Sequence, residues 1–121
     1  MTYKLIERSD WVPFISSVSK LVHGQLAEVE IIGLDIGDQI EKDWTTIDGI
    51  SYDDLEDVLY VHRQPFNYEI RNPEKMFSAE EGLVMKMLTI QDNQDHLQII
   101  HFREPLRLEA AREPKDPFAN Y

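Results

Sequence analysis

The hydrophobic pattern changes its period once, at Gly24, and this change constrains the fold more than any other feature. Before Gly24, apolar residues recur every three or four positions, and after it they alternate with polar residues. The first spacing buries one stripe of a helix, whereas the second buries one face of a strand. The sequence therefore predicts one N-terminal helix followed by a series of strands.

The predicted helix covers residues 10–23. Asp10 is expected to cap it, because Pro13 then falls within the first turn, where a missing N–H costs little. Gly24 is expected to end it in the left-handed conformation. Ser16, Ser17, Ser19 and Lys20 are expected to face water. The apolar stripe consists of Trp11, Phe14, Ile15, Val18, Leu21 and Val22.

The first predicted strand, residues 26–32, turns Glu28 and Glu30 to one face and Ala27, Val29 and Ile31 to the other. A turn at 33–38 leads to a second strand at 39–47, which places Glu41 and Asp43 on its exposed face. Further strands are predicted at residues 58–62, 66–70, 83–90 and 96–103, with a short return at 75–78.

Short strands with closely spaced turns favour an antiparallel meander. We therefore expect an α+β fold, in which the helix packs on a strongly bent or barrel-like antiparallel sheet of five to seven strands. Residues 1–108 are expected to form one domain, followed by a poorly ordered charged tail at 109–121. Trp11 and Trp44 are expected to share the core. Alternation also favours a core position for Leu83, Met85 and Met87, which with Met76 and Phe77 could instead line an apolar pocket.

Acidic residues are concentrated in one third of the chain. The 121 residues carry a net charge of −11, and residues 24–62 hold eleven acids against the single Lys42, a net charge of −10. Such a segment repels phosphate backbones and anionic lipid, so neither nucleic acid nor a membrane is an expected partner. The chain has no cysteine and no apolar N-terminal leader, which favours a cytoplasmic protein. No cofactor is expected.

Four segments form a set of motifs: a W-x-x-F-I helix, a G-D-Q-x-E-x-x-W hairpin, the run G-I-S-Y-D, and D-V-L at the start of a strand. This set resembles a family of small bacterial proteins known only as a domain of unknown function. The resemblance covers residues 9–108 and departs at Tyr68, where the family pattern has histidine. It implies a single bacterial domain and brings no known activity. The matching residues are Trp11, Phe14 and Ile15; Gly37, Gln39, Glu41 and Trp44; Gly49, Ile50, Ser51, Tyr52 and Asp53; and Asp57, Val58 and Leu59.

Two clusters are candidate sites. The first is the acidic loop of Asp53, Asp54, Glu56 and Asp57, whose carboxylates could bind a divalent cation, although the order of an EF-hand is absent and a solvated turn explains the same residues. The second is a ligand site where the helix covers the mouth of the sheet, near Trp44, Tyr52, Tyr60 and Tyr68. No catalytic motif is present, and none of the four histidines has metal-ligand spacing.

Two kinds of function remain open from the sequence. The preferred hypothesis is a non-enzymatic interaction protein that presents an acidic sheet face to a basic protein or to a second copy of itself. The alternative is a small-molecule binder or enzyme with its site under the helix.

Overall fold

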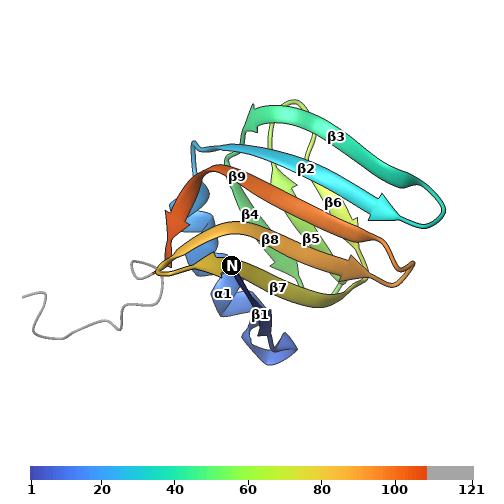
Figure 1. The fold of residues 1–121 in the computed structure, drawn as a ribbon, viewed down its shortest axis with the longest axis horizontal. Helices are drawn as coiled ribbons and strands as arrows, with labels where there is room; N and C mark the ends of the chain where they lie inside the picture. The colour runs from blue at the N-terminus through green and yellow to red at the C-terminus, as the bar shows by residue number, and fades with distance from the viewer. Residues whose placement is uncertain (109–121) are drawn as a thin grey trace, which may run out of the picture.

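The computed structural model describes residues 1–108, except for the side chains of residues 41–43, and the predicted tail at 109–121 lies outside the described residues. Within residues 1–108 the structure has nine strands, one α-helix and a short 3-10 helix (Figure 1). The helices are η1 (Arg8–Asp10) and α1 (Trp11–Val22). The strands are β1 (Thr2–Ile6), β2 (Leu26–Gly33), β3 (Gly37–Thr46), β4 (Gly49–Asp53), β5 (Val58–His62), β6 (Tyr68–Arg71), β7 (Pro73–Glu81), β8 (Val84–Asp92) and β9 (Leu97–Arg107).

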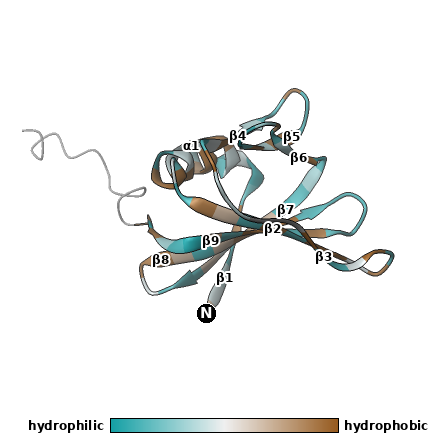
Figure 2. Ribbon diagram, turned by 90° about the horizontal axis from the view of Figure 1, so that it is seen from above, coloured by the Kyte–Doolittle hydropathy of each residue, from teal (hydrophilic) through white to brown (hydrophobic). Residues whose placement is uncertain are grey.

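The strands divide between two antiparallel sheets. The larger sheet has six strands in the order β1-β7-β8-β9-β2-β3, and the smaller has three in the order β4-β5-β6. Figure 2 shows α1 and the smaller sheet together on one side of the larger sheet. The α+β class and the antiparallel pairing are confirmed, and the larger sheet has a strand number within the predicted range.

The predicted closure of the sheet is wrong. In the described part of the chain, β1 and β3 are the unpaired ends of an open six-stranded sheet, which is neither closed nor strongly curled. Closure is unnecessary because the smaller sheet, together with α1, already covers the face that a barrel would have turned inward. A simple meander is also wrong, since β9 pairs with β2 as well as with β8.

The helix lies where the pattern predicts it. Trp11, Ile15, Val18 and Val22 are buried, while Phe14 and Leu21 pack against the same core. Gly24 ends the helix with φ +79°, as predicted. Asp10 precedes the helix but makes no side-chain capping bond, because η1 runs directly into α1 and leaves Asp10 in helical geometry.

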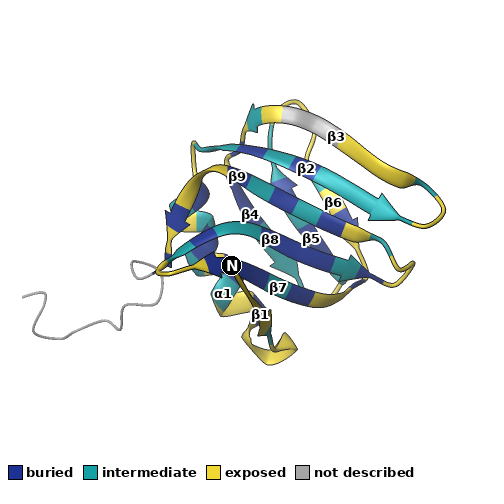
Figure 3. Ribbon diagram, in the orientation of Figure 1, coloured by how far each residue is buried: buried dark blue, intermediate teal, exposed yellow. Residues whose placement is uncertain are grey.

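The core lies between the two sheets and the helix, and β7, β8 and β9 carry most of the buried positions of the larger sheet (Figure 3). Buried positions alternate over residues 97–102 of β9, whereas β7 and β8 each have three consecutive buried residues. The six-stranded sheet contributes one face to it, which we call the inner face, and the opposite face is called the outer face. The inner face includes Met76, Leu88, Ile90 and Ile100, and the smaller sheet contributes Ile50, Leu59, Val61 and Ile70.

Three hydrophobic residues, Trp44, Met87 and Leu83, do not lie where the sequence predicts them. Trp44 is 41% exposed, whereas Trp11 is 1% exposed, so the two do not share the core. A break in register between Met85 and Met87 leaves Met85 in the core, while Met87 pairs across the ladder with His101 on the outer face. Leu83 is exposed in the turn before β8.

Candidate functional site

The outer face of the six-stranded sheet carries an apolar groove of about 390 Å³. Cross-strand pairing builds it: Phe77 lies opposite Thr89, and Thr89 lies opposite Ile99, so three neighbouring strands present one row of side chains. We call this depression the outer groove. It is lined by Tyr3, Phe77, Met87, Thr89, Leu97 and Ile99.

A row of carboxylates borders the outer groove on β2 and β3. Glu30 lies directly opposite Ile99, and Glu28 lies opposite His101, so the acids share a face with the apolar residues. Asp38 lies opposite Ile32, which in turn lies opposite Leu97. We call Glu28, Glu30 and Asp38 the acidic strip. Glu28 and Glu30 belong to the predicted acidic face, whereas the sequence assigns Asp38 to the turn at 33–38. The side chains of Glu41 and Asp43, the other members of that face, lie outside the described residues.

A histidine of β9 forms a hydrogen bond with the acidic strip. The Nε2 atom of His101 lies 2.8 Å from Oε1 of Glu30. Hydrogen bonds from Asp38 and His101 lower the pKa of Glu30, and the hydrogen bond shared with Glu30 raises the pKa of Asp38. Glu30 therefore keeps its negative charge to a lower pH than Asp38 does.

A second groove, of about 490 Å³, lies between α1 and β4, one of the two edge strands of the smaller sheet. We call it the α1–β4 groove. Its lining includes Val12, Ile15, Ser16, Lys20, Ile50 and Ser51. Ser19, which the sequence assigned to the solvent, bonds to the sheet instead: its Oγ accepts a hydrogen bond of 3.0 Å from the Ile50 N–H.

A serine–histidine pair lies beside this groove and was not predicted. Ser51 Oγ and His62 Nε2 are 2.6 Å apart on adjacent strands, and the His62 ring stacks on Tyr60. Nucleophilic catalysis would also need a group that orients the histidine and donors for an oxyanion. In the described residues, no carboxylate bonds to His62. The pair therefore reads as a cross-strand polar contact.

A chain of polar contacts joins the two sheets at the β8–β9 turn. The Tyr68 hydroxyl donates to Gln98 Oε1 at 2.6 Å, and Gln98 Nε2 donates to Asp92 Oδ2 at 2.8 Å. The other oxygen of Asp92 accepts the backbone N–H groups of Gln94 and His96. The acceptor oxygens of Gln98 and Asp92 are thus already occupied, and we infer that this network stabilises the fold.

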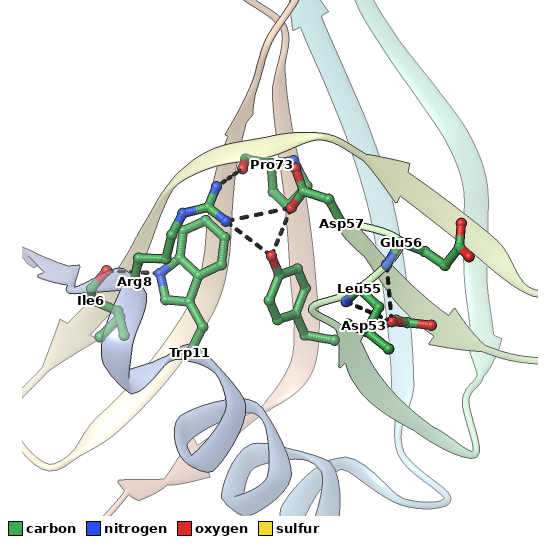
Figure 4. A network of polar contacts seen from close by, with 9 residues as sticks. Ile6, Arg8, Trp11, Asp53, Leu55, Glu56, Asp57 and Pro73 are labelled. Atoms are coloured by element: carbon green, nitrogen blue, oxygen red, sulfur yellow. Dashed lines mark hydrogen bonds and ion pairs between the residues drawn. The ribbon is translucent and has the colours of Figure 1, made fainter.

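Arg8 ties η1 to both sheets, as the close view shows (Figure 4). Its guanidinium lies 4.2 Å from the Trp11 ring centroid and donates to Pro73 O at 2.6 Å and to the Tyr52 hydroxyl at 3.0 Å. The same hydroxyl donates to Asp57 at 2.7 Å. Burial, and then the bond to Asp57, raises the pKa of Tyr52.

The four residues predicted to form a ligand site do not converge. Tyr52 packs edge-on against Trp11 in the core, and Tyr68 points towards Gln98. Tyr60 lies on the opposite face of the smaller sheet, because it pairs with Ser51 while Tyr52 pairs with Leu59. Trp44 lies on β3 in the other sheet, with the Arg103 guanidinium 5.9 Å from its ring.

The acidic loop uses two of its carboxylates locally. Asp53 Oδ1 accepts the N–H groups of Leu55 and Glu56, and Asp57 bonds to Tyr52 (Figure 4). Asp54 and Glu56 are exposed. Across the residues that the structure describes, no group of three or more His, Asp or Glu side chains is arranged to hold a metal ion. Cation binding by this loop stays a prediction.

Comparison with known proteins places the chain in a family. A protein of Aquifex aeolicus (strain VF5), described as an uncharacterized protein, is 24% identical over 109 residues, which cover 89% of this chain and 98% of the relative. No solved structure matches the chain. Within residues 1–108, no helix combines the length and apolar character needed to cross a membrane. The pattern of the family of unknown function DUF5335 matches residues 2–111, and the chain therefore belongs to that family.

Proposed function

We propose that this protein is a non-enzymatic docking module that binds a partner protein on the outer face of its six-stranded sheet. The partner surface is apolar at its centre and basic at its margin. The observation that carries this proposal is the outer groove with the acidic strip along one side of it. The absence of cysteine supports a cytoplasmic setting.

The outer groove supplies the apolar part of the docking surface. The inner face of the sheet is covered by α1 and the smaller sheet, whereas the outer face leaves Tyr3 60% and Leu97 36% exposed. Contiguous apolar surface costs free energy in water unless something covers it, and aromatic and aliphatic anchors dominate binding at protein interfaces. Phe77 and Met87, half-buried between them, provide an adaptable floor.

The acidic strip selects the charge of the occupant. Glu28 and Glu30 are half-buried on β2, so their charges are less screened than those of fully exposed carboxylates. A basic margin on the partner complements them and accelerates association. A second copy of this chain is a poorer occupant, because it would set an acidic strip and a net charge of −11 against its own kind.

Two synthetic amphipathic peptides test the proposal directly. One is built from leucine and lysine, and the other replaces each lysine with glutamate. We expect the lysine peptide to bind, to perturb the emission of Trp44, and to bind more weakly as salt rises. The glutamate peptide should not bind. Equal binding of both peptides would show that the acidic strip selects nothing and would overturn the proposal.

Matched variants locate the binding surface. Tyr3→Ser combined with Leu97→Ser should weaken binding of the lysine peptide by at least about tenfold. Leu55→Ser is the control, because Leu55 is 92% exposed but lies in the β4–β5 turn, and it should leave binding unchanged. Glu30→Gln should weaken binding. Glu56→Gln, which like Leu55 lies in the β4–β5 turn, is its control and should not weaken binding. A dimer in light scattering that Tyr3→Ser and Leu97→Ser abolish would assign the face to self-association instead.

A further inference from the structure

We propose that the α1–β4 groove is a binding site for a small monocarboxylate with an aliphatic or aromatic body. The groove lies in the other layer of the molecule from the outer groove, so the two sites are independent. Its volume of about 490 Å³ falls within the range of small-molecule sites. Its lining combines an apolar floor with hydroxyl groups and one cation.

The floor is apolar and rigid. Ile15 of α1 and Ile50 of β4 both line the groove and are both buried in the core, at 1% and 2% exposure. Val12, which is exposed, and the Tyr52 ring, which packs against Trp11, also line the groove. A hydrocarbon chain or a small ring placed there would lose water from the side that contacts Ile15 and Ile50.

The polar side of the groove comes from one stripe of the helix. Ser16, Ser19 and Lys20 follow each other at helical spacing and all line the groove, opposite Ser51. The Ser19 hydroxyl oxygen accepts the bond from Ile50 N–H, so its own proton remains available to a ligand. These hydroxyl donors, together with an ammonium group, match the acceptor-only oxygens of a carboxylate.

Lys20 is the cation of the site. Among the described residues, no carboxylate lies within ion-pair distance of its ammonium group, in contrast to Lys86 and Arg71. Lys20 is thus a cation without an acidic partner in a strongly acidic protein. A ligand carboxylate would supply that partner.

The charge around the groove favours one negative charge over two. Asp48 lines the same groove, and the whole chain carries −11. The repulsion is about twice as large for a dianionic phosphate as for a monocarboxylate. A monocarboxylate with an apolar body also gains free energy by burying that body against the apolar floor.

Backbone amide chemical shifts of the ¹⁵N-labelled protein test the proposal with defined probes. Hexanoate and phenylacetate should produce saturable shifts at residues of α1 and β4, with Kd values in the millimolar range for ligands of this size. Hexylamine, hexan-1-ol and inorganic phosphate should each bind at least about tenfold more weakly. Equal binding of hexan-1-ol would remove the carboxylate from the proposal, and equal binding of phosphate would remove the apolar body. Either result, or no saturable shift with both carboxylates, would overturn it.

Two variants assign the site to the groove. Lys20→Gln should raise the Kd for hexanoate by about tenfold, and Lys75→Gln, an exposed lysine on β7, should not change it. Ser16→Phe should fill the groove and abolish the shifts, since Ser16 is exposed and its replacement leaves the core intact. Unchanged hexanoate binding in both Lys20→Gln and Ser16→Phe would overturn the assignment. The Tyr3→Ser, Leu97→Ser protein should bind hexanoate normally, which separates this site from the docking face.

Discussion

The imidazole ring of His96 occupies the space that a side chain at Gly33 would need. A Cβ atom on Gly33 would lie 2.5 Å from His96 Cδ2, well inside van der Waals contact. The ring is held in place because His96 Nε2 lies 2.8 Å from Asp35 Oδ1 in the β2–β3 turn. Contact between the β2–β3 and β8–β9 turns therefore requires glycine at this position.

Gly33→Ala should destabilise the protein by about 1–3 kcal/mol, because the new methyl group must displace a held ring. Urea unfolding measures the loss. In a His96→Ala background the same substitution should be neutral or stabilising, since alanine favours an extended strand over glycine. An equal loss in both backgrounds would show that the ring is not the obstacle.

The hydrogen bond from His96 lowers the pKa of Asp35. The stability contributed by this lowered pKa is present above the ordinary aspartate value near 3.9 and is lost as the pH falls through the lowered value. Carboxyl-carbon NMR titration should place Asp35 below its ordinary pKa in the wild type. In His96→Ala the value should return towards the ordinary one, and a value that did not move would rule out His96 as the cause.

Asp92→Ala should cost about 2–4 kcal/mol, because it removes the acceptor for three donors at once. Those donors are the N–H groups of Gln94 and His96 and the side-chain amide of Gln98. Asn93→Ala, in the same turn and exposed, is the control and should change stability by less than about 0.5 kcal/mol. Comparable urea midpoints for the two variants would contradict the buried-acceptor role.

Tyr52→Phe should cost about 1–2 kcal/mol at neutral pH, because the Asp57 and Arg8 bonds lose their shared hydroxyl. Tyr60→Phe is the matched control. The raised pKa of Tyr52 adds stability that is fully present below the ordinary tyrosine value near 10 and is lost as the pH rises through the raised value. Stability measured above pH 10 should therefore fall less steeply in Tyr52→Phe than in the wild type, and equal slopes would be inconsistent with this account.

Ser78→Ala should stabilise the protein by about 1 kcal/mol. Ser78 is fully buried on β7, and its hydroxyl oxygen has no hydrogen-bond partner among the residues that the structure describes. Alanine removes the unpaired polar group and leaves almost no cavity. Thermal and urea unfolding check the sign, and a loss of stability would indicate that the hydroxyl is paired in solution.

The elements that the sequence predicts well are those whose signal is local. The stripe of α1, the alternation of β2 and the bounds of β5 all follow from neighbouring residues. β1 was missed because four of its five residues are exposed and it is held by pairing with β7, which is distant in the sequence, for example Leu5 with Phe77. β4 was missed because its short run begins at a glycine after a turn signal. On its free edge, Ser19 of α1 accepts one N–H group, that of Ile50, and this contact is distant in the sequence.

The candidate sites depend on information that a single strand does not contain. Alternation placed Met87 with Met85, but the break in register between them turned Met87 to the outer face. The outer groove then arises from four strands whose order, β1-β7-β8-β9, no local pattern specifies. The sequence predicts more of the α1–β4 groove, because its pattern already assigns the helix serines and Lys20 to the side of the helix away from the core. Only the packing of α1 against β4 shows what they face.

The position of β9 has a consequence for how the protein is made. β9 is the last strand of the described chain, yet it lies between β8 and β2, joining a hairpin synthesised early to one synthesised late. Until residues 97–107 leave the ribosome, both hairpins expose an unpaired edge, and the six-stranded sheet cannot form. Translation therefore delays completion of the larger sheet until its C-terminal strand emerges, and a nascent chain halted before Leu97 would hold two separate hairpins that share no ladder.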